Sequence, residues 1–410
     1  MRMRIKEICD FVSRGKTPDY VDQSPYKVMN QATFSKGRLD ETNVRYTSHG
    51  IEEARIRRGD LLMASTGGGV LGKVYYFDSD DDAFYADSHV SILRNGKGKH
   101  LMKYLYYVFS IRYEEINATM VKGSTNQTEL QKNYLLSYEM DMPSLSEQQR
   151  IVAYLDEKTA EIDRQVALLE KELDACLRLK CAVINRSVTQ GLNPNVPLKD
   201  SGIDWIGMIP EHWKVKRIKD AFELRNGYTP SKNNPAFWES GTIPWYRMDD
   251  IRESGRKLKE AKQYITPEAV KGNGLFEAGS FILATTATIG EHAMLIVDSL
   301  ANQRFTNLKI RKSLITRLSK EFLFYYMFIV DDFCKTSTRQ TTFAAVNIEE
   351  LKNFIVVIPT IEEQQSIATY LDAACAKIDA KAENIRKRID AYKRLKRSLI
   401  NEVVTGKRAV

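Results

Sequence analysis

A glycine-rich segment, Gly67 to Val74, contains residue types that could bind a nucleotide. It fits both the GxGxxG and the GxxxxGK spacing, which cradle phosphate groups where a strand leads into a helix. The residue after Lys73 is Val74, so the hydroxyl that would bind Mg²⁺ is missing, and the run that follows is typical of a strand. We therefore expect a turn whose glycines take positive φ angles rather than a nucleotide site.

The other motifs with catalytic or metal-binding residue types also lack the context that they need. Asn234-Pro235-Ala236-Phe237 resembles the (Asn/Asp)-Pro-Pro-(Tyr/Phe) motif of amino-methyltransferases, but it lacks the second proline and a glycine-rich cofactor loop, so a surface turn before Trp238 is expected. The five histidines show no ligand-like spacing, and no Ser/His/Asp order stands out. The sequence predicts no catalytic residue, no metal ligand and no cofactor site in this chain.

Two polar loops contain residue types that contact DNA. Lys122 to Thr128 and Lys335 to Thr342 are rich in hydroxyls, amides and cations, the groups that contact phosphates and base edges. A solvated loop would have the same composition, so composition alone leaves both interpretations open. The loops hold corresponding places in two halves of the chain, and this favours binding.

The two halves are copies of one another. Pro143 to Asp156 recurs as Pro359 to Asp372, and the register holds without a gap to Ile400-Asn401 in the second copy. A match of this length indicates an internal duplication. The duplication also includes shorter matches upstream, where Gly15-Lys16-Thr17-Pro18 pairs with Gly227-Tyr228-Thr229-Pro230, and Gly59 to Ala64 pairs with Gly279 to Ala284.

Each repeated segment begins a long helix. Ser144 with Glu147, and Thr360 with Glu363, have the S/T-x-x-E spacing of a capping box. Apolar residues then recur at alternating intervals of four and three, the pattern of a coiled-coil seam. Each helix should be about 44 residues, or about 66 Å, long and must pack on a partner to be stable. The seam positions are Ile162, Val166, Leu169, Leu173 and Cys176 in the first helix, and Ile378, Ala382, Ile385, Ile389 and Tyr392 in the second.

Chain geometry predicts that the two helices pair with each other in antiparallel orientation. Parallel helices would force the roughly 20-residue linker after Gly191 to run back along the rod almost fully extended. A pseudo-two-fold axis across an antiparallel pair would place two globular domains at opposite ends of a rod. Because one turn of B-DNA is about 34 Å, such a rod could hold two readers roughly two turns apart.

The predicted fold class is α/β (α+β), with two globular domains of one fold separated by two long antiparallel coiled-coil helices. Apolar runs predict strands at 72–77 and 353–358, and aromatic stretches predict helices at 101–113 and 320–333. Trp205 and Ile206 suggest that the linker docks on something. The predicted boundaries are 1–142 and 211–358 for the domains, 143–190 and 359–410 for the helices, and 191–210 for the linker.

Composition indicates a cytoplasmic protein with more than one core. The chain has 410 residues, and 61 Lys and Arg against 53 Asp and Glu give a net charge of +8, which permits an anionic partner without requiring one. The five cysteines are scattered, which argues against disulfides and zinc. No signal peptide or membrane span is expected. The basic run from Arg386 to Arg397 is either a DNA-binding stripe or, as we favour, the solvated face of a coiled coil.

Taken together, these motifs resemble a known family. A domain with Gly-x-Thr-Pro near its start and a Gly-Asp-Leu-Leu strand, followed by Pro-x-x-x-Glu-Gln-Gln-x-Ile and a long helix, all present twice, is similar to the specificity (S) subunit of type I restriction-modification enzymes. The resemblance covers essentially the whole chain, and the two Glu-Gln-Gln segments are its most specific part. One departure is that the first half lacks the lead-in that the second half has at Ile209 to Trp213.

The resemblance implies a non-catalytic subunit whose two target-recognition domains each read one half of a split, asymmetric DNA site. It implies two methylation subunits that bind the helices and carry S-adenosylmethionine, and restriction subunits that use ATP and Mg²⁺, in a prokaryotic, DNA-associated host-defence complex. Candidate DNA contacts are Lys16, Thr17, Lys122, Ser124, Asn126, Gln127, Tyr228, Thr229, Arg304, Arg339, Gln340 and Thr341. Candidate partner-contact and helix-pairing residues are Gln148, Gln149, Leu155, Ile162, Leu169, Gln364, Gln365, Leu371, Ile378 and Ile385.

Two alternatives remain on sequence grounds. The chain could be a non-enzymatic scaffold whose end domains bind proteins, or a self-contained methyltransferase or helicase-like enzyme. A steep salt dependence of binding to a bipartite duplex separates DNA recognition from the scaffold.

Overall fold

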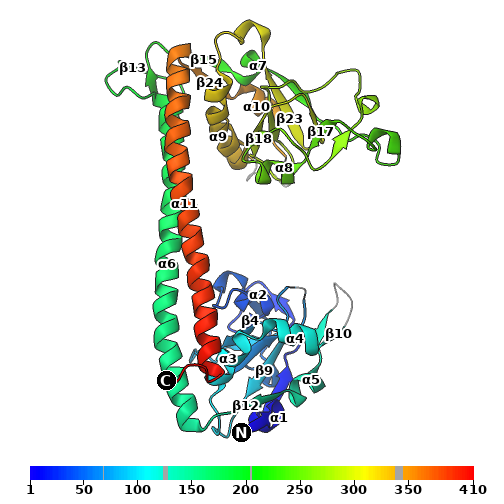
Figure 1. The fold of residues 1–410 in the computed structure, drawn as a ribbon, viewed down its shortest axis with the longest axis vertical. Helices are drawn as coiled ribbons and strands as arrows, with labels where there is room; N and C mark the ends of the chain where they lie inside the picture. Colours follow the sequence, from blue (N-terminus) through cyan, green and yellow to red (C-terminus); the bar gives the residue numbers. More distant parts are fainter. Residues whose placement is uncertain (68, 123–127, 204–205, 338–344) are drawn as a thin grey trace. The chain divides into compact units, whose positions relative to one another are not determined.

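The computed structural model describes residues 1–410 except 68, 123–127, 204–205 and 338–344, and it divides into two compact units (Figure 1). The first unit contains residues 1–170 and 387–410, and the second contains 171–386. Each unit therefore holds one globular α/β domain and about half of each long helix.

The domain of the first unit is built on two four-stranded sheets. One is antiparallel, with the order β2 (Phe11–Arg14), β9 (Val90–Arg94), β6 (Leu61–Ala64), β7 (Val74–Tyr76). The other has the order β3 (Tyr20–Val21), β5 (Arg45–Thr47), β4 (Lys27–Met29), β8 (Phe84–Ala86), and its β4–β8 pair is parallel.

The central strand β6 explains the apolar run Leu-Leu-Met-Ala. All four side chains are buried, and successive residues point to opposite faces of the sheet. Leu61 and Met63 belong to a core shared with the helices, whereas Leu62 and Ala64 belong to the core under the second sheet. A strand that is buried on both faces has no polar position, so it does not show alternation in the sequence.

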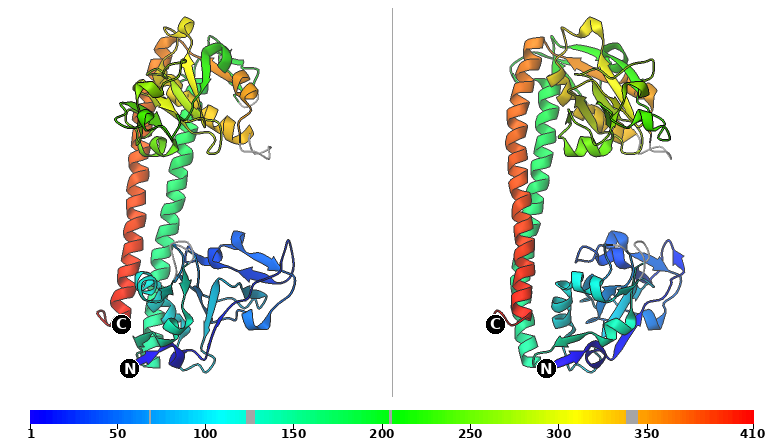
Figure 2. Two further views of the ribbon diagram at one scale, coloured as in Figure 1. Left: turned by 90° about the vertical axis from the view of Figure 1, so that its right-hand side faces the viewer. Right: turned by 45° about the vertical axis from the view of Figure 1, so that its right-hand side comes forward.

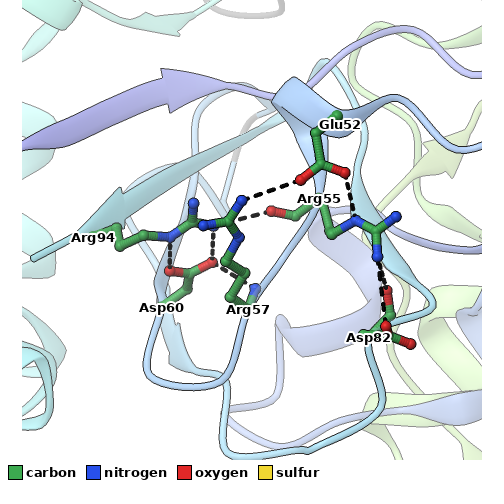
Figure 3. Close-up of polar contacts among 6 residues, drawn as sticks. All are labelled: Glu52, Arg55, Arg57, Asp60, Asp82 and Arg94. Carbon is green, nitrogen blue, oxygen red and sulfur yellow. Dashed lines mark hydrogen bonds and ion pairs between the residues drawn. The ribbon is translucent and has the colours of Figure 1, made fainter. Parts of the chain in front are cut away.

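A buried ion pair joins β9 to the turn before β6 (Figure 3). Nε and one terminal nitrogen of Arg94 each donate to the Asp60 carboxylate at 2.7 Å, and Arg57 N donates to Asp60 Oδ2 at 2.7 Å. The Asp60 side chain is 1% exposed and that of Arg94 is 17% exposed. The neighbouring Glu52, Arg55 and Asp82 form a more exposed network in the same view.

The domain of the second unit repeats this plan. Its larger sheet has the order β16 (Phe222–Asn226), β23 (Phe305–Ile310), β20 (Phe281–Ala284), β21 (His292–Leu295), β18 (Lys257–Leu258). Its smaller sheet has the order β19 (Tyr264–Ile265), β17 (Ile243–Tyr246), β22 (Leu300–Ala301), with β17 and β22 parallel. The four buried residues of β20 again divide between two cores.

Each domain closes on itself just before its long helix. In the first, β1 (Arg2–Arg4) pairs with β12 (Glu139–Asp141), and in the second, β15 (Lys214–Arg217) pairs with β24 (Ile355–Ile358). An aromatic helix packs on one sheet of each domain: α3 (Met102–Ser110) on the sheet that contains β6, and α9 (Lys320–Ser337) on the five-stranded sheet of the second domain. The short helices are α1 (Ile5–Ile8), α2 (Gln31–Phe34), α4 (Tyr113–Thr119), α5 (Lys132–Ser137), α7 (Ile218–Ala221), α8 (Met248–Glu253) and α10 (Ile348–Asn353).

The long helices are α6 (Leu145–Gln190) and α11 (Ile361–Val404), and they lie side by side in each unit (Figure 1 and Figure 2). Glu147 N donates to Ser144 Oγ and Glu363 N to Thr360 Oγ1, both at 3.3 Å, so the predicted hydroxyl caps form. In the second copy Thr360 N also donates to Glu363 Oε2 at 3.0 Å, which completes the capping box.

Ion pairs within the second unit show that the helices are antiparallel, as predicted. Lys180 Nζ lies 2.6 Å from Asp379, while Glu172, earlier on α6, lies 2.9 Å from Lys381, later on α11. In the first unit Lys396 Nζ lies 2.6 Å from Asp163. The repeat aligns Asp163 with Asp379 and Lys180 with Lys396, so this is one contact made twice.

The apolar seam is buried or half-buried along both helices. Leu169 and Ile385 are 4% and 2% exposed, and the basic run at 386–397 lies mainly on exposed positions. Exposure of the basic run fits both the solvated-face and the DNA-stripe interpretations. Hydrophobic burial of the seam is what stabilises helices of this length.

The linker packs on the second unit, as Ile206 suggested, whereas Trp205 lies outside the described residues. A hairpin of β13 (Leu198–Asp200) and β14 (Met208–Pro210) leads to Trp213, which is 1% exposed and shares a core with α6 and α11. Trp213 Nε1 donates to Glu363 at 3.3 Å. The lead-in therefore anchors the first turn of α11.

The motifs that resembled catalytic or phosphate-binding segments are turns. Gly67, Gly69 and Gly72 all have positive φ angles, and β7 follows directly. Residues Pro235–Phe237 form a single 3₁₀ turn, capped by Asn234. Within the described residues there is no group of three or more His, Cys, Asp or Glu side chains that could hold a metal ion, and no helix is long and apolar enough to cross a membrane.

Candidate nucleic-acid interface

The polar loop of the first domain is carried by a short hairpin next to the end of β6. Strand β10 (Val121–Lys122) pairs with β11 (Glu129–Leu130), and Leu130 N donates to Ser65 O at 2.8 Å. The candidates Ser124, Asn126 and Gln127 lie outside the described residues, as does the side chain of Lys122.

The Gly-Lys-Thr-Pro segment lies beside the turn between β8 and β9. Gly15 N donates to Val90 O at 2.9 Å and Lys16 N to Ala86 O at 3.2 Å. A Cβ atom on Gly15 would lie 2.2 Å from Ala86 O, so only glycine fits there. The side chains of Lys16 and Thr17, both sequence candidates, are exposed next to this turn.

A cluster of polar side chains completes this face of the first domain, and the sequence analysis missed it. Thr66 Oγ1 lies 2.6 Å from His89 Nδ1 and 3.4 Å from Gln31 Oε1. Thr66 also pairs with Glu129 at the base of the polar loop. His89 is exposed in the β8–β9 turn. It aligns with Arg304, a DNA-contact candidate from the sequence, and this alignment between the two halves could have identified His89.

The second domain builds the same arrangement. Gly227 N donates to Phe305 O and Tyr228 N to Ala301 O, both at 2.9 Å, and a Cβ on Gly227 would lie 2.3 Å from Ala301 O. Thr286 pairs with Ala345, at the end of the second polar loop. The candidates Arg339, Gln340 and Thr341 lie outside the described residues.

The equivalent turns of the two domains present His89 and Arg304 in the same way. His89 N donates to Asp87 Oδ1 at 2.8 Å, and Arg304 N donates to Asn302 Oδ1 at 2.9 Å. Both side chains are exposed. In each domain the Gly-x-Thr-Pro segment, the turn before β9 or β23, and the loop after β6 or β20 lie together, and we call this the three-loop surface. Its residues are Lys16, Thr17, Gln31, Thr66 and His89 in the first domain, and Tyr228, Thr229, Thr286, Gln303 and Arg304 in the second.

Several polar groups near these surfaces serve the domains themselves. Tyr228 OH donates to Ala269 O at 3.0 Å and accepts from Lys271 N at 2.8 Å, so this hydroxyl is occupied internally. Thr229 Oγ1 donates to Gln303 Oε1 at 2.5 Å. Burial raises the pKa of the Asp87 carboxyl, against the opposing effect of the hydrogen bond from His89 N. Arg14 pairs with Glu129 beside the polar loop.

These surfaces offer side chains that can form hydrogen bonds and ion pairs. Hydroxyl, amide, imidazole and guanidinium groups lie on loops held by rigid strands, and such groups hydrogen-bond to phosphates and base edges.

The helix-start candidates divide by exposure. Gln149 and Gln365 are exposed, whereas Gln148 and Gln364 are fully buried against their own domains. Leu155 and Leu371, both 0% exposed, pack in the domain cores together with residues of α3 and α9. The candidates Ile162, Leu169 and Ile385 are buried and Ile378 is half-buried.

Comparison with known proteins identifies the family. A family model described as the type I restriction modification DNA specificity domain matches residues 1–172 and 210–391. The chain belongs to this family. Its function is DNA recognition as the specificity subunit of a type I restriction-modification system, of which it is a non-catalytic component.

Individual relatives agree with this membership. The type I restriction enzyme EcoprrI specificity subunit of Escherichia coli is 47% identical over 142 residues, which span 35% of each chain. The putative type I restriction enzyme MjaX specificity subunit of Methanocaldococcus jannaschii is 22% identical over 412 residues, covering 98% of this chain and 92% of the relative. A structure solved in a study of assembly and conformational transition of the type I R-M system has the same fold, with a TM-score of 0.69 at 16% identity over 98% of this chain and 97% of the other.

Proposed function

We propose that this specificity subunit reads a bipartite, asymmetric sequence in double-stranded DNA, with each domain reading one half. The presence of a three-loop surface in both domains carries the proposal. Each surface is supported by the same backbone contacts, yet its exposed side chains differ, with His89 in one and Arg304 in the other. Two similar scaffolds with different side chains would read two different half-sites.

Roles within each surface follow from side-chain chemistry. Cations such as Lys16, Lys122 and Arg339 would hold phosphates, while amides and Arg304 would contact base edges. A good bidentate contact to a base contributes about 1–3 kcal/mol of discrimination. His89 and Gln31 join the base-reading candidates because they lie beside the exposed turn and the polar loop.

The helices would bind two methylation subunits, which bring S-adenosylmethionine, and restriction subunits would add ATP and Mg²⁺ chemistry. Exposed apolar residues at equivalent places support this docking, since Leu179 on α6 and Leu395 on α11 are both 53% exposed. The exposed Gln149 and Gln365 are further candidates. The complex would act in the prokaryotic cytoplasm, where its DNA lies.

The helix pair would also serve as the ruler between the half-sites. The uninterrupted lengths of α6 and α11, 46 and 44 residues, support this role, as does the buried seam. A stiff pair would keep the two readers at one separation along the duplex.

Binding of the full chain to a bipartite duplex at increasing salt tests DNA recognition. Neutralised phosphates release counterions, so the affinity for the duplex should fall steeply as the salt concentration rises. A scaffold that binds only proteins would not show this salt-dependent binding to the duplex. Mapping of methylated adenines in cells with and without the chain would identify the site. Incorporation of labelled S-adenosylmethionine by the isolated chain would instead indicate a self-contained enzyme.

A further inference from the structure

The first glutamine of each Glu-Gln-Gln segment is used inside the molecule. Gln148 is 0% exposed, and its Oε1 accepts from Leu101 N at 2.9 Å. Its Nε2 donates to Pro143 O at 2.9 Å and lies 3.2 Å from His100 Nδ1. Leu101 directly precedes α3, so this amide connects the first turn of α6 to the start of the aromatic helix of the domain.

The second copy makes the equivalent contact. Gln364 is 0% exposed, and its Oε1 accepts from Ser319 N at 2.7 Å. Its Nε2 donates to Arg317 O at 2.9 Å and to Pro359 O at 3.0 Å. Ser319 directly precedes α9, which is the counterpart of α3. The buried amide thus has the same role in both copies of the repeat.

A second polar contact joins the same two helices two turns further along. Tyr107 OH donates to Asp156 Oδ1 at 2.5 Å in the first unit, and Tyr325 OH donates to Asp372 Oδ1 at 2.6 Å in the second. Burial, and then the aspartate acceptor, raises the pKa of each tyrosine hydroxyl above its usual range.

Apolar contacts fill the space between the two polar points. Leu155 and Leu371, at equivalent positions, are both fully buried. Ile151 and Ile367 lie one turn earlier and are 6% and 1% exposed. A buried amide that satisfies its hydrogen bonds permits few orientations, because any rotation leaves a polar group unpaired in an apolar core.

We propose that these contacts are positioning clamps that set the orientation of each recognition domain on its long helix. The clamps are Gln148, Tyr107 and Asp156 in the first unit, and Gln364, Tyr325 and Asp372 in the second. The two contacts are eight residues apart on the long helix, so the domain cannot rotate about one of them without breaking the other. This inference rests on the proposed bipartite reading, and it assigns Gln148 and Gln364 to orientation rather than to partner binding.

The clamps should therefore control the tolerated spacing between half-sites rather than the bases that are read. A domain that rocks on its helix brings its loops to a range of positions along the duplex. The hydrogen bonds of the three-loop surfaces join loops of one domain and involve none of the clamp residues. Loss of the clamps should weaken discrimination between spacer lengths and leave half-site preference intact.

The experiment uses the full chain, with the partners that co-purify, and duplexes whose spacer varies by one and two base pairs around the preferred length. The test protein is the double variant Gln148→Met and Gln364→Met, which keeps side-chain volume and removes the amide. The control is Gln165→Met with Asn384→Met, at exposed positions of α6 and α11 that take part in none of the contacts described above. We expect the ratio of affinities between the preferred spacer and its neighbours to fall by about tenfold in the test protein only. A folded test protein with wild-type spacer discrimination would overturn the proposal.

A second variant keeps the proposal testable if the methionine pair does not fold. Tyr107→Phe with Tyr325→Phe removes only the two hydroxyls, and it should reduce spacer discrimination in the same direction with unchanged half-site preference. An unchanged spacer ratio in this folded pair would count against the clamps. If the wild-type chain binds duplexes of all spacer lengths equally, the proposed ruler role is wrong. If the wild-type chain prefers one spacer length and both variants keep that preference, the ruler stands and the clamp proposal is wrong.

Discussion

At the residue scale, the same few polar positions recur in both halves. Burial separates the residues that stabilise the domain interior from those that are exposed on its surface. Asp60 and Gln148 are buried and complete the interior of the first domain, whereas Lys16 and His89 are exposed beside its polar loop. Residue type alone does not separate these roles. Asp60 belongs to the Gly-Asp-Leu-Leu match, yet Ser280 takes its place in the second domain, where it accepts a hydrogen bond from Asn307.

Removing Arg94 should destabilise the chain strongly. Arg94→Ala leaves the Asp60 carboxylate buried with its main cation gone, and breaking such a pair costs about 3–5 kcal/mol. Arg58→Ala is the control, because Arg58 pairs with Asp78 and Asp80 at exposed positions, where solvent screening leaves the pair contributing much less to stability. Chemical denaturation of both variants measures the difference, and equal losses would contradict the structural role of the buried pair.

Exposed residues of the three-loop surfaces should affect DNA affinity without affecting stability. His89→Ala and Arg304→Ala should each lose about 1–3 kcal/mol of discrimination at one half-site only, because in the proposed bipartite reading each domain contacts its own half-site. Competition binding with duplexes altered in one half-site measures this. The loop variants Arg339→Ala and Gln340→Ala should act on the second half-site, and unchanged binding and preference would show that this loop does not read DNA.

At the element scale, the long helices depend on their apolar seam much more than on their ion pairs. Leu169 is nearly fully buried. In the Asp163–Lys396 and Lys180–Asp379 ion pairs, by contrast, the aspartate side chain is exposed. The pairs define antiparallel register, because a parallel arrangement would not bring these residues together. Their contribution to the free energy of unfolding is expected to be small.

A comparison of seam and ion-pair variants tests this ranking. Leu169→Ala should reduce the free energy of unfolding by about 2–5 kcal/mol, since it leaves a cavity between the helices. Asp163→Ala should reduce it by less than about 1 kcal/mol. Thermal unfolding followed by circular dichroism provides the measurement, and a larger effect of Asp163→Ala would reverse our assignment of what holds the helices together.

At the scale of the whole molecule, the proposed ruler makes a quantitative prediction. Insertion of one heptad near Leu169 and another near Ile385 adds about 10 Å of helix while preserving the seam. The preferred gap between half-sites should then increase by about three base pairs. Binding to a duplex series with graded spacers measures the shift. An insertion of three residues is the control, because it breaks the seam register and should abolish rather than move the preference.

The amino-acid sequence by itself determined the repeat, the two long helices, their caps and the family, because these depend on local spacing. Gapless repetition, S/T-x-x-E boxes and four-three periodicity are readable without knowing what any residue touches. The two polar loops and Arg304 stay predictions as DNA contacts. Strand order was not predictable, because β6 and β20 are buried on both faces and show no alternation.

Only the tertiary structure decided which residues of these motifs face outward. Gln148 and Gln149 are adjacent and identical in type, yet one is buried against its domain and the other is exposed. Thr66, His89 and Gln31 meet although they are far apart in the chain, because β4, β6 and β9 bring three loops to one place. Such meetings depend on long-range strand pairing, for which a single sequence holds no local signal.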